Sequence, residues 1–179
     1  CGVHAYLKDK GINLLLSTSV EGFEPQGSGL RTLLSEERFL DADMVILAIG
    51  VTPETQLAKE AGLRLGQRGS IAVNDRMETS DPDIYAGGDS VEVEDFVSGQ
   101  GVLIPLAGPA NRQGRIIADN IAGYDSVYKK TIGSAVVKVF DLTVASAGNS
   151  EETLIKRGIP YLKTFTFGFS HASYYPNAT

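Results

Sequence analysis

The sequence has little of what several classes of protein require. Its single cysteine, Cys1, cannot form a disulfide within the chain, which favours a reducing, cytoplasmic setting. With only His4 and His171 beside that cysteine, the usual zinc-ligand clusters are excluded, and we expect no metal site. Apolar runs fall short of the roughly 20 residues that cross a bilayer, so we expect no membrane partner.

Positive charge is also scarce, because 16 lysines and arginines face 22 acidic residues. A nucleic-acid surface needs clustered basic side chains, so we expect no nucleic-acid partner. The 179 residues, 42% of them hydrophobic, are enough for one core or two small ones. The chain opens within a helix-like stretch that has no capping residue, and it stops after a strand-like run at "YYPNAT". These ends predict a fragment of a longer protein.

The periodicity of the first half predicts mixed α/β structure. A helix is expected over residues 3–10, a strand over 12–24, and two further strands after the turn at 25–29. "MVILAIG" (44–50) is a continuous apolar run ending in glycine, which is typical of a strand covered on both faces. A short helix capped by Thr55 follows, then a strand and a turn within 69–80, and a short buried strand over 84–86.

The strongest helix signal begins at Pro109 and ends at Gly123. Apolar and small residues recur there at helical spacing and predict a buried face made of Ala110, Gly114, Ile117, Ala118, Ile121 and Ala122. Beyond a domain boundary near Asp125, the pattern predicts strands over 134–140 and 142–148. A helix capped by Ser150 and a strand over 161–170 are expected to follow.

The stretch "TSDPDIYAGGDS" (79–90) places a carboxylate at the tip of a short strand. Ligands of open α/β sheets bind outside the carboxyl ends of the strands, where Asp89 is expected to lie. Gly87 and Gly88 put no side chain in front of it, so it can accept hydrogen bonds from the hydroxyls of a sugar or sugar alcohol. The alternative is an ordinary turn or helix-capping aspartate.

Two further stretches can contribute to a site. The start of the helix after "PLAG" presents unpaired N–H groups that favour an anionic ligand edge, although most helix starts bind only water or a cap. In "HASYYPNAT", one of the adjacent Tyr174 and Tyr175 can present its phenol to a thiolate or oxyanion, and packing of both rings is the alternative. His171 is interpreted as structural, and Cys1 as a bystander.

Taken together, "VILAIGVTPET", "TSDPDIYAGGDS" and "PLAGPANRQGRIIADNI", in this order, resemble the C-terminal half of a flavin-dependent pyridine nucleotide-disulfide oxidoreductase. The family pattern of Thr, four residues, Ile-Tyr-Ala, one residue and Gly-Asp is matched from Thr79 to Asp89. "PLAGPANRQGR" and "HASYYP" are similar to the branch that contains coenzyme A-disulfide reductases, NADH oxidases and persulfide reductases. The resemblance covers essentially the whole chain.

The resemblance implies an α/β fold: a partial Rossmann-like FAD/NAD(P)-binding domain followed by the start of an α+β dimerisation domain. Residues 1–49 would end the nicotinamide-nucleotide domain, 50–125 would be the C-terminal part of the FAD domain, and 126–179 would begin the dimerisation domain. Asp89 would hydrogen-bond the ribityl chain of FAD, and Gly88 would allow its close approach. The flavin's pyrimidine edge would lie near the backbone of Leu106, Ala107, Pro109 and Ala110.

The activity implied for the parent protein is electron transfer from NAD(P)H through FAD to a cysteine-linked disulfide. Coenzyme A disulfide is the favoured substrate, and in a homodimer Tyr174 or Tyr175 would reach the partner subunit's active site. The alternatives are an NADH oxidase, a persulfide or polysulfide reductase, and a non-catalytic interaction module if the chain is complete as it stands. The 179 residues contain neither a G-x-G-x-x-G loop nor the family's redox cysteine, so the chain alone is expected to be inactive.

Overall fold

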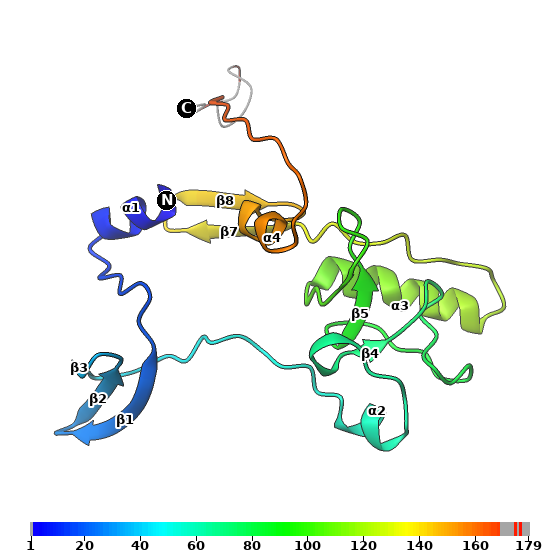
Figure 1. Cartoon of the computed structure of the whole chain (residues 1–179), viewed down its shortest axis with the longest axis horizontal. Helices are drawn as coiled ribbons and strands as arrows, with labels where there is room; N and C mark the ends of the chain where they lie inside the picture. Colours follow the sequence, from blue (N-terminus) through cyan, green and yellow to red (C-terminus); the bar gives the residue numbers. More distant parts are fainter. Residues whose placement is uncertain (1, 169–173, 175, 177–179) are drawn as a thin grey trace. The chain divides into compact units, whose positions relative to one another are not determined.

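The computed structural model describes residues 2–168, 174 and 176. The chain divides into two compact units, Cys1–Val51 and Thr52–Thr179, whose elements are labelled in Figure 1. The expected division into three domains, at 49/50 and 125/126, stays a prediction. Among the described residues, none of the helices has both the length and the apolar character needed to cross a membrane.

The first unit is a helix followed by an antiparallel sheet. It consists of α1 (Gly2–Asp9), β1 (Val20–Gln26), β2 (Gly29–Leu34) and β3 (Arg38–Ala42), with the strands in the order β1-β2-β3. Gly27, at a φ of 59°, makes the expected turn between β1 and β2. Across β2 and β3, Arg31 donates to both oxygens of Asp41 at 2.7 and 2.9 Å, which favours this register.

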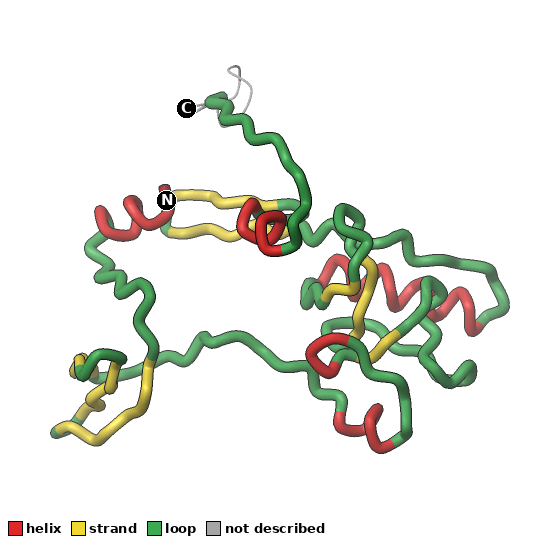
Figure 2. Tube along the Cα trace, in the orientation of Figure 1, coloured by secondary structure: helices red, strands yellow, loops and turns green. Residues whose placement is uncertain are grey.

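Two sequence predictions fail in this unit. The first strand begins only at Val20, not at residue 12. Residues 44–50 do not form a buried strand; Figure 2 shows a loop there, and Ile49 is 90% exposed. A strand needs backbone partners as well as an apolar sequence, and no described strand pairs with this segment. The apolar run therefore stays extended and unpaired.

The second unit begins with short elements. They are α2 (Gln56–Glu60), the 3₁₀ turn η1 (Gln67–Gly69), β4 (Ile71–Ala72), β5 (Val91–Glu94) and β6 (Gly101–Val102). β5 lies between β4, with which it is parallel, and β6, with which it is antiparallel. Thr55 precedes α2 as expected but does not cap it, because its hydroxyl donates to the Gly69 carbonyl at 2.7 Å instead. The strand and turn expected over 69–80 are both present, but the strand is only the two residues of β4.

Helix α3 (Ala107–Ile121) packs on this small sheet. The core that it shares with β5 contains Met77, Val91, Val93, Ile116 and Tyr128. Most of the predicted buried face is wrong, since the buried positions of α3 are Gln113, Ile116 and Asn120, while Ile121 is 67% exposed. Of the predicted face, Ile117 does pack, partly buried, against the core. Counting apolar and small residues misplaced the face because two polar side chains point inward and are hydrogen-bonded there.

The remaining elements are a hairpin and a short helix. β7 (Ala135–Val139) pairs antiparallel with β8 (Leu142–Ser146), and α4 (Glu151–Lys156) follows. Ser150 caps α4 as predicted, accepting a hydrogen bond from the Thr153 N–H at 3.2 Å. The strand predicted for 161–170 is absent from its described part, 161–168, where Tyr161 and Lys163 instead contact the Glu151 carboxylate at 2.7 and 2.6 Å.

Candidate functional site

The turn that carries Asp89 lies between two paired segments. Before it, Tyr85 forms a bridge with Glu78, and the Ala86 N–H donates to the Met77 carbonyl at 3.1 Å. After it, β5 begins at Val91, and the Ile71 N–H donates a hydrogen bond to the Ser90 carbonyl at 2.8 Å. The predicted strand over 84–86 is thus a single bridge, yet it fixes the turn from one side while β5 fixes it from the other.

Gly88 adopts a backbone conformation that other residues rarely take. Its φ is +89°, and a Cβ built there would meet nothing within 4 Å, so the space in front of the turn is open. At Gly87, a Cβ would come within 2.9 Å of the Ile117 Cδ1 atom, so this glycine lets the turn lie against α3. The Asp89 carboxylate itself is exposed, and among the described residues it has no hydrogen-bond or ion-pair partner.

A buried glutamine fastens this turn to α3. The Gly88 N–H donates to Oε1 of Gln113 at 2.7 Å, and Gln113 is only 2% exposed. Because Gln113 lies in the second turn of α3, the hydrogen bond sets the position of Gly88 and Asp89 relative to the first part of that helix. The sequence analysis missed this residue, although Gln113, Ile116 and Asn120 have the spacing of one helical stripe.

The start of α3 is uncapped. Leu106 precedes it in an extended conformation and supplies no side-chain cap, and the first intrahelical bond runs from the Ala110 N–H to the Leu106 carbonyl at 3.2 Å. The N–H groups of Ala107 and Gly108 therefore have no intrahelical acceptor, and Pro109 has no N–H. Arg112 and Arg115 flank a depression beside these groups, so the local potential is positive.

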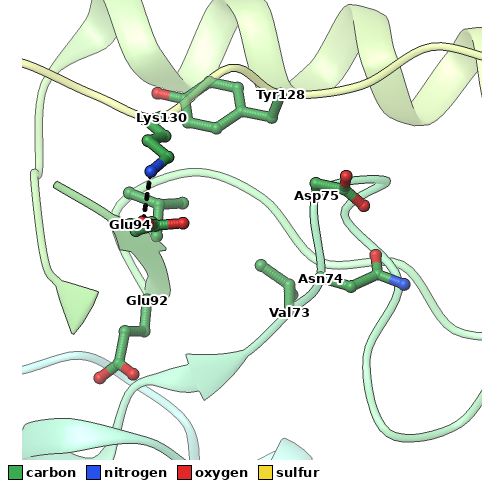
Figure 3. A pocket seen from close by; sticks show the side chains of 8 residues that line it. Val73, Asn74, Asp75, Glu92, Glu94, Tyr128 and Lys130 are labelled. Carbon is green, nitrogen blue, oxygen red and sulfur yellow. Dashed lines mark ion pairs between the residues drawn. The ribbon is translucent and has the colours of Figure 1, made fainter. Parts of the chain in front are cut away.

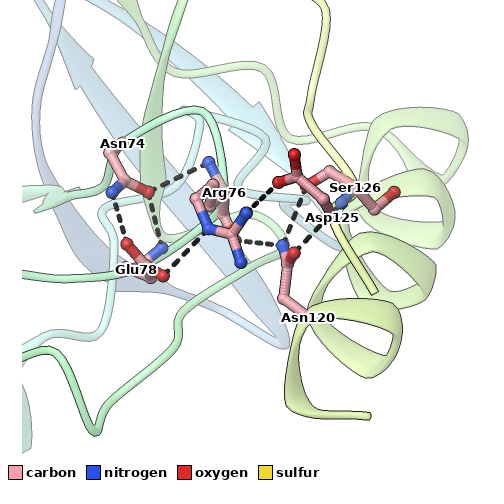
Figure 4. A network of polar contacts seen from close by, with 6 residues as sticks. All are labelled: Asn74, Arg76, Glu78, Asn120, Asp125 and Ser126. Carbon is pink, nitrogen blue, oxygen red and sulfur yellow. Dashed lines mark hydrogen bonds and ion pairs between the residues drawn. The ribbon is translucent and has the colours of Figure 1, made fainter. Parts of the chain in front are cut away.

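A polar network holds the other end of α3. Asn120 donates to the carbonyls of Arg76 and Ser126 at 3.0 and 2.9 Å and accepts from the Ser126 N–H at 3.1 Å. Hydrogen bonds from Asn74, and then from Arg76, hold the pKa of Glu78 below its usual value. Figure 4 shows the members of the network, which are Asn74, Arg76, Glu78, Asn120, Asp125 and Ser126. The helix is thus anchored near its middle by Gln113 and at its C-terminal end by Asn120, which keeps its uncapped start in a defined place.

This arrangement fits the ribityl chain and ring edge of a flavin. An exposed carboxylate accepts hydrogen bonds from hydroxyl groups, and the glycine beside it leaves room for their approach. The free N–H groups at the start of α3 suit an electron-rich ring edge. The predicted residues Gly88 and Asp89 lie on one element, Leu106, Ala107, Pro109 and Ala110 on the other, and Gln113 joins the two elements.

A second pocket, lined in part by β5, has different chemistry (Figure 3). Asp75, Glu92 and Glu94 line it together with Lys130, whose ammonium pairs with Glu94 at 2.6 Å. This excess of carboxylates disfavours an anionic ligand such as a nucleotide phosphate. Within the described part of the chain, no cluster of acidic, histidine or cysteine side chains could hold a metal ion.

Only one of the two candidate tyrosines lies among the described residues. Tyr174 is described and is 81% exposed, so its ring is not part of a core. Tyr175 and His171 lie outside the described residues. The role of either tyrosine toward a thiol therefore stays a prediction.

Comparison with known proteins places these features in one family. A family model described as pyridine nucleotide-disulphide oxidoreductase matches residues 2–114. An NADH oxidase of Methanocaldococcus jannaschii is 37% identical over 174 residues, which are 97% of this chain and 38% of that protein. A CoA-dependent NAD(P)H sulfur oxidoreductase of Pyrococcus abyssi is 36% identical over 75% of this chain and 30% of its own length.

A solved structure agrees with these relatives. The crystal structure of reduced Bacillus anthracis CoADR-RHD superposes on 99% of this chain and 32% of its own, with a TM-score of 0.91 and 50% sequence identity. The residues therefore adopt the mixed α/β fold of FAD- and NAD-binding oxidoreductases. The chain spans only about a third of the length of the relatives that it matches.

Proposed function

Because the chain belongs to the pyridine nucleotide-disulphide oxidoreductase family, we propose that it is the part of an NAD(P)H-dependent flavoenzyme that holds the flavin. The observation that carries this proposal is the exposed Asp89 carboxylate, held next to Gly88 by the bond from the Gly88 N–H to Gln113. The structure supports one binding surface made of this turn and the start of α3.

Each residue of the surface has a separate task in this proposal. Asp89 binds hydroxyls of the ribityl chain, and Gly88 leaves the room that the chain needs. The N–H groups of Ala107 and Gly108 stabilise negative charge on the ring edge near Leu106–Ala110, while Pro109 starts the helix without adding a donor. FAD bound there would accept hydride from NAD(P)H and pass the electrons on.

For the acceptor we propose a disulfide linked to the enzyme's cysteine, with coenzyme A disulfide as the substrate. The CoA-dependent relative and the CoADR-RHD structure support this choice. NADH oxidase activity is the second candidate, because the NADH oxidase relative matches 97% of the chain. A homodimer in which residues 126–179 begin the dimerisation domain, and in which Tyr174 or Tyr175 reaches the partner subunit's thiol, completes the proposal.

The binding role is tested by Asp89→Ala in the full-length protein. Removing a charge-assisted hydrogen bond worth roughly 1.5–3 kcal/mol should weaken FAD binding by roughly 10- to 150-fold, measured by flavin fluorescence on titration of the apoprotein. The matched control is Asp119→Ala, the same change at an exposed aspartate of α3 whose side chain has no partner among the described residues. An unchanged dissociation constant for Asp89→Ala would contradict the role.

The acceptor is identified by stopped-flow oxidation of the reduced enzyme. Coenzyme A disulfide, a persulfide and dioxygen are mixed separately with enzyme reduced anaerobically by NADH. Coenzyme A disulfide should reoxidise the enzyme fastest. Tyr174→Phe or Tyr175→Phe, whichever replaces the tyrosine that acts at the thiol, should slow this step and leave flavin reduction by NADH unchanged. Faster reoxidation by dioxygen would favour the NADH oxidase instead.

A further inference from the structure

A buried carboxylate outside the proposed flavin surface joins distant parts of the second unit. Asp95 directly follows β5 and is 4% exposed. Its Oδ1 atom accepts three hydrogen bonds: from the Ser98 N–H at 2.6 Å, from the Ser98 hydroxyl at 2.7 Å and from Nδ2 of Asn149 at 2.9 Å. The first two close a local turn, whereas the third reaches the loop between β8 and α4.

Arg157 extends the cluster from the far end of α4. Its Nη1 atom donates to the Ser98 hydroxyl at 2.7 Å and contacts Oδ1 of Asn149 at 3.4 Å. The Ser98 hydroxyl therefore donates to Asp95 and accepts from Arg157. Asn149 stands just before α4, and Arg157 is its C-terminal cap residue, so the two contacts hold both ends of this helix.

The backbone reinforces the same junction. The Phe96 N–H donates to the Thr131 carbonyl at 2.8 Å, and the Thr131 N–H donates to the Glu94 carbonyl at 2.9 Å. The Gly148 N–H then bonds the Ile132 carbonyl at 2.8 Å, next to Asn149. Residues 94–98, 131–132 and 148–157 are therefore connected, with the Asp95 carboxylate at their centre.

A local turn alone does not account for Asp95. Ser98 would satisfy one oxygen of an exposed aspartate just as well, without the cost of burying a charge. Buried charges persist where several partners satisfy them. Here Asn149 donates to Asp95 directly and Arg157 donates to the Ser98 hydroxyl, both from a segment more than fifty positions away. The carboxylate thus has a role that depends on the contact with α4.

We propose that Asp95 is a positioning residue that fixes α4 and the loop before it relative to the flavin-binding turn, which lies only six positions upstream. In this way α4, which precedes Tyr174 in the sequence, keeps its place while Asp89 and α3 hold the flavin. This second clause rests on the proposed function, whereas the contact between Asp95, Asn149 and Arg157 does not.

Three variants of the full-length protein separate the long-range contact from the local turn. Asp95→Ala removes all three hydrogen bonds. Asn149→Ala removes the distant one, together with the Arg157 contact to Asn149, and leaves the two from Ser98. Asp95→Asn keeps an Oδ1 acceptor while removing the charge. Asp119→Ala repeats the aspartate-to-alanine change at an exposed site. Asn149→Ala leaves the local turn intact, so the contact can be tested even if Asp95→Ala does not fold.

Hydrogen exchange tests the contact without any need for flavin. Asp95→Ala and Asn149→Ala should each speed amide exchange in residues 147–158 by roughly tenfold to a hundredfold, Asp95→Asn by less, and Asp119→Ala not at all. Faster exchange confined to residues 95–100, with 147–158 unchanged, would overturn the proposal.

Half-reaction kinetics test the positioning role. In the flavin-loaded protein, Asn149→Ala should slow reoxidation by the disulfide acceptor severalfold and leave the rate of flavin reduction by NADH unchanged. Equal slowing of both steps, or no slowing of reoxidation despite faster exchange, would overturn it. Wild-type protein that binds no flavin would instead refute the proposed function, and the exchange result would still stand.

Discussion

Replacing Gln113 with leucine should release the turn that holds Asp89. Leucine is close to glutamine in size and is apolar, so it can occupy the buried position beside Ile116 with little change in packing. What it removes is the Oε1 acceptor that the Gly88 N–H contacts at 2.7 Å. The variant therefore tests one hydrogen bond rather than a cavity.

The expected cost follows from the burial of that bond. A buried donor left without an acceptor destabilises a protein by roughly 1–3 kcal/mol. In the flavin-free protein, the freed turn will also spend less time in the conformation that presents Asp89. The apparent affinity for FAD falls in proportion to that population. If the whole 1–3 kcal/mol acts on this conformation, the affinity falls by roughly 5- to 150-fold, which is the upper limit of the effect.

Two assays on the full-length protein measure these effects. Urea unfolding gives the free energy of unfolding of the apoprotein, and flavin fluorescence gives the dissociation constant of FAD. Gln67→Leu is the control, because Gln67 is exposed and its side chain has no partner in the described part of the chain. If Gln113→Leu matches the wild type in both assays, Gln113 does not hold the turn and the reasoning is wrong.

Two further predictions concern backbone strain and pH. Gly88→Ala should lower the free energy of unfolding by about 1–2 kcal/mol, because φ is +89° at that position. Gly114→Ala should raise it by up to about 1 kcal/mol, because Gly114 is an exposed position of α3 with open space around it. Urea unfolding of both variants checks these opposite signs. Burial opposes the charge of Asp95, yet the hydrogen bonds from Ser98 and Asn149 and the nearby Arg157 outweigh it and lower the pKa of that carboxyl. Since the pKa of Asp95 is lower in the folded than in the unfolded protein, its stabilisation is complete above the unfolded pKa and is lost as pH falls through the folded pKa. Between about pH 5 and pH 3, Asp95→Asn should therefore lose stability less steeply than the wild type. Urea midpoints of the two proteins that fall in parallel over that range would contradict this.

Much of the secondary structure follows from local signals in the sequence. Gly27 at a turn between β1 and β2, Ser150 as a helix cap and Pro109 in the first turn of α3 each act through their own backbone preferences. The resemblance to the family is likewise confirmed, because it rests on motifs in a fixed order.

What failed depended on partners that local patterns do not reveal. Residues 44–50 are apolar enough for a buried strand, but a strand forms only where another strand can satisfy its backbone. The buried face of α3 was misassigned because Gln113 and Asn120 are buried through hydrogen bonds to residues 25 and 44 positions away. The roles of Asp89, of Leu106–Ala110 and of the two tyrosines stay predictions that the experiments above can decide.

The most direct test of the central claim is an anaerobic titration of the purified full-length protein with NADH, followed by visible absorption. We expect the spectrum of an oxidised, non-covalently bound flavin that bleaches as NADH is added, and we expect the Asp89→Ala protein to lose its flavin on dialysis. Full-length protein without a flavin spectrum, or with a flavin that NADH does not reduce, would contradict it.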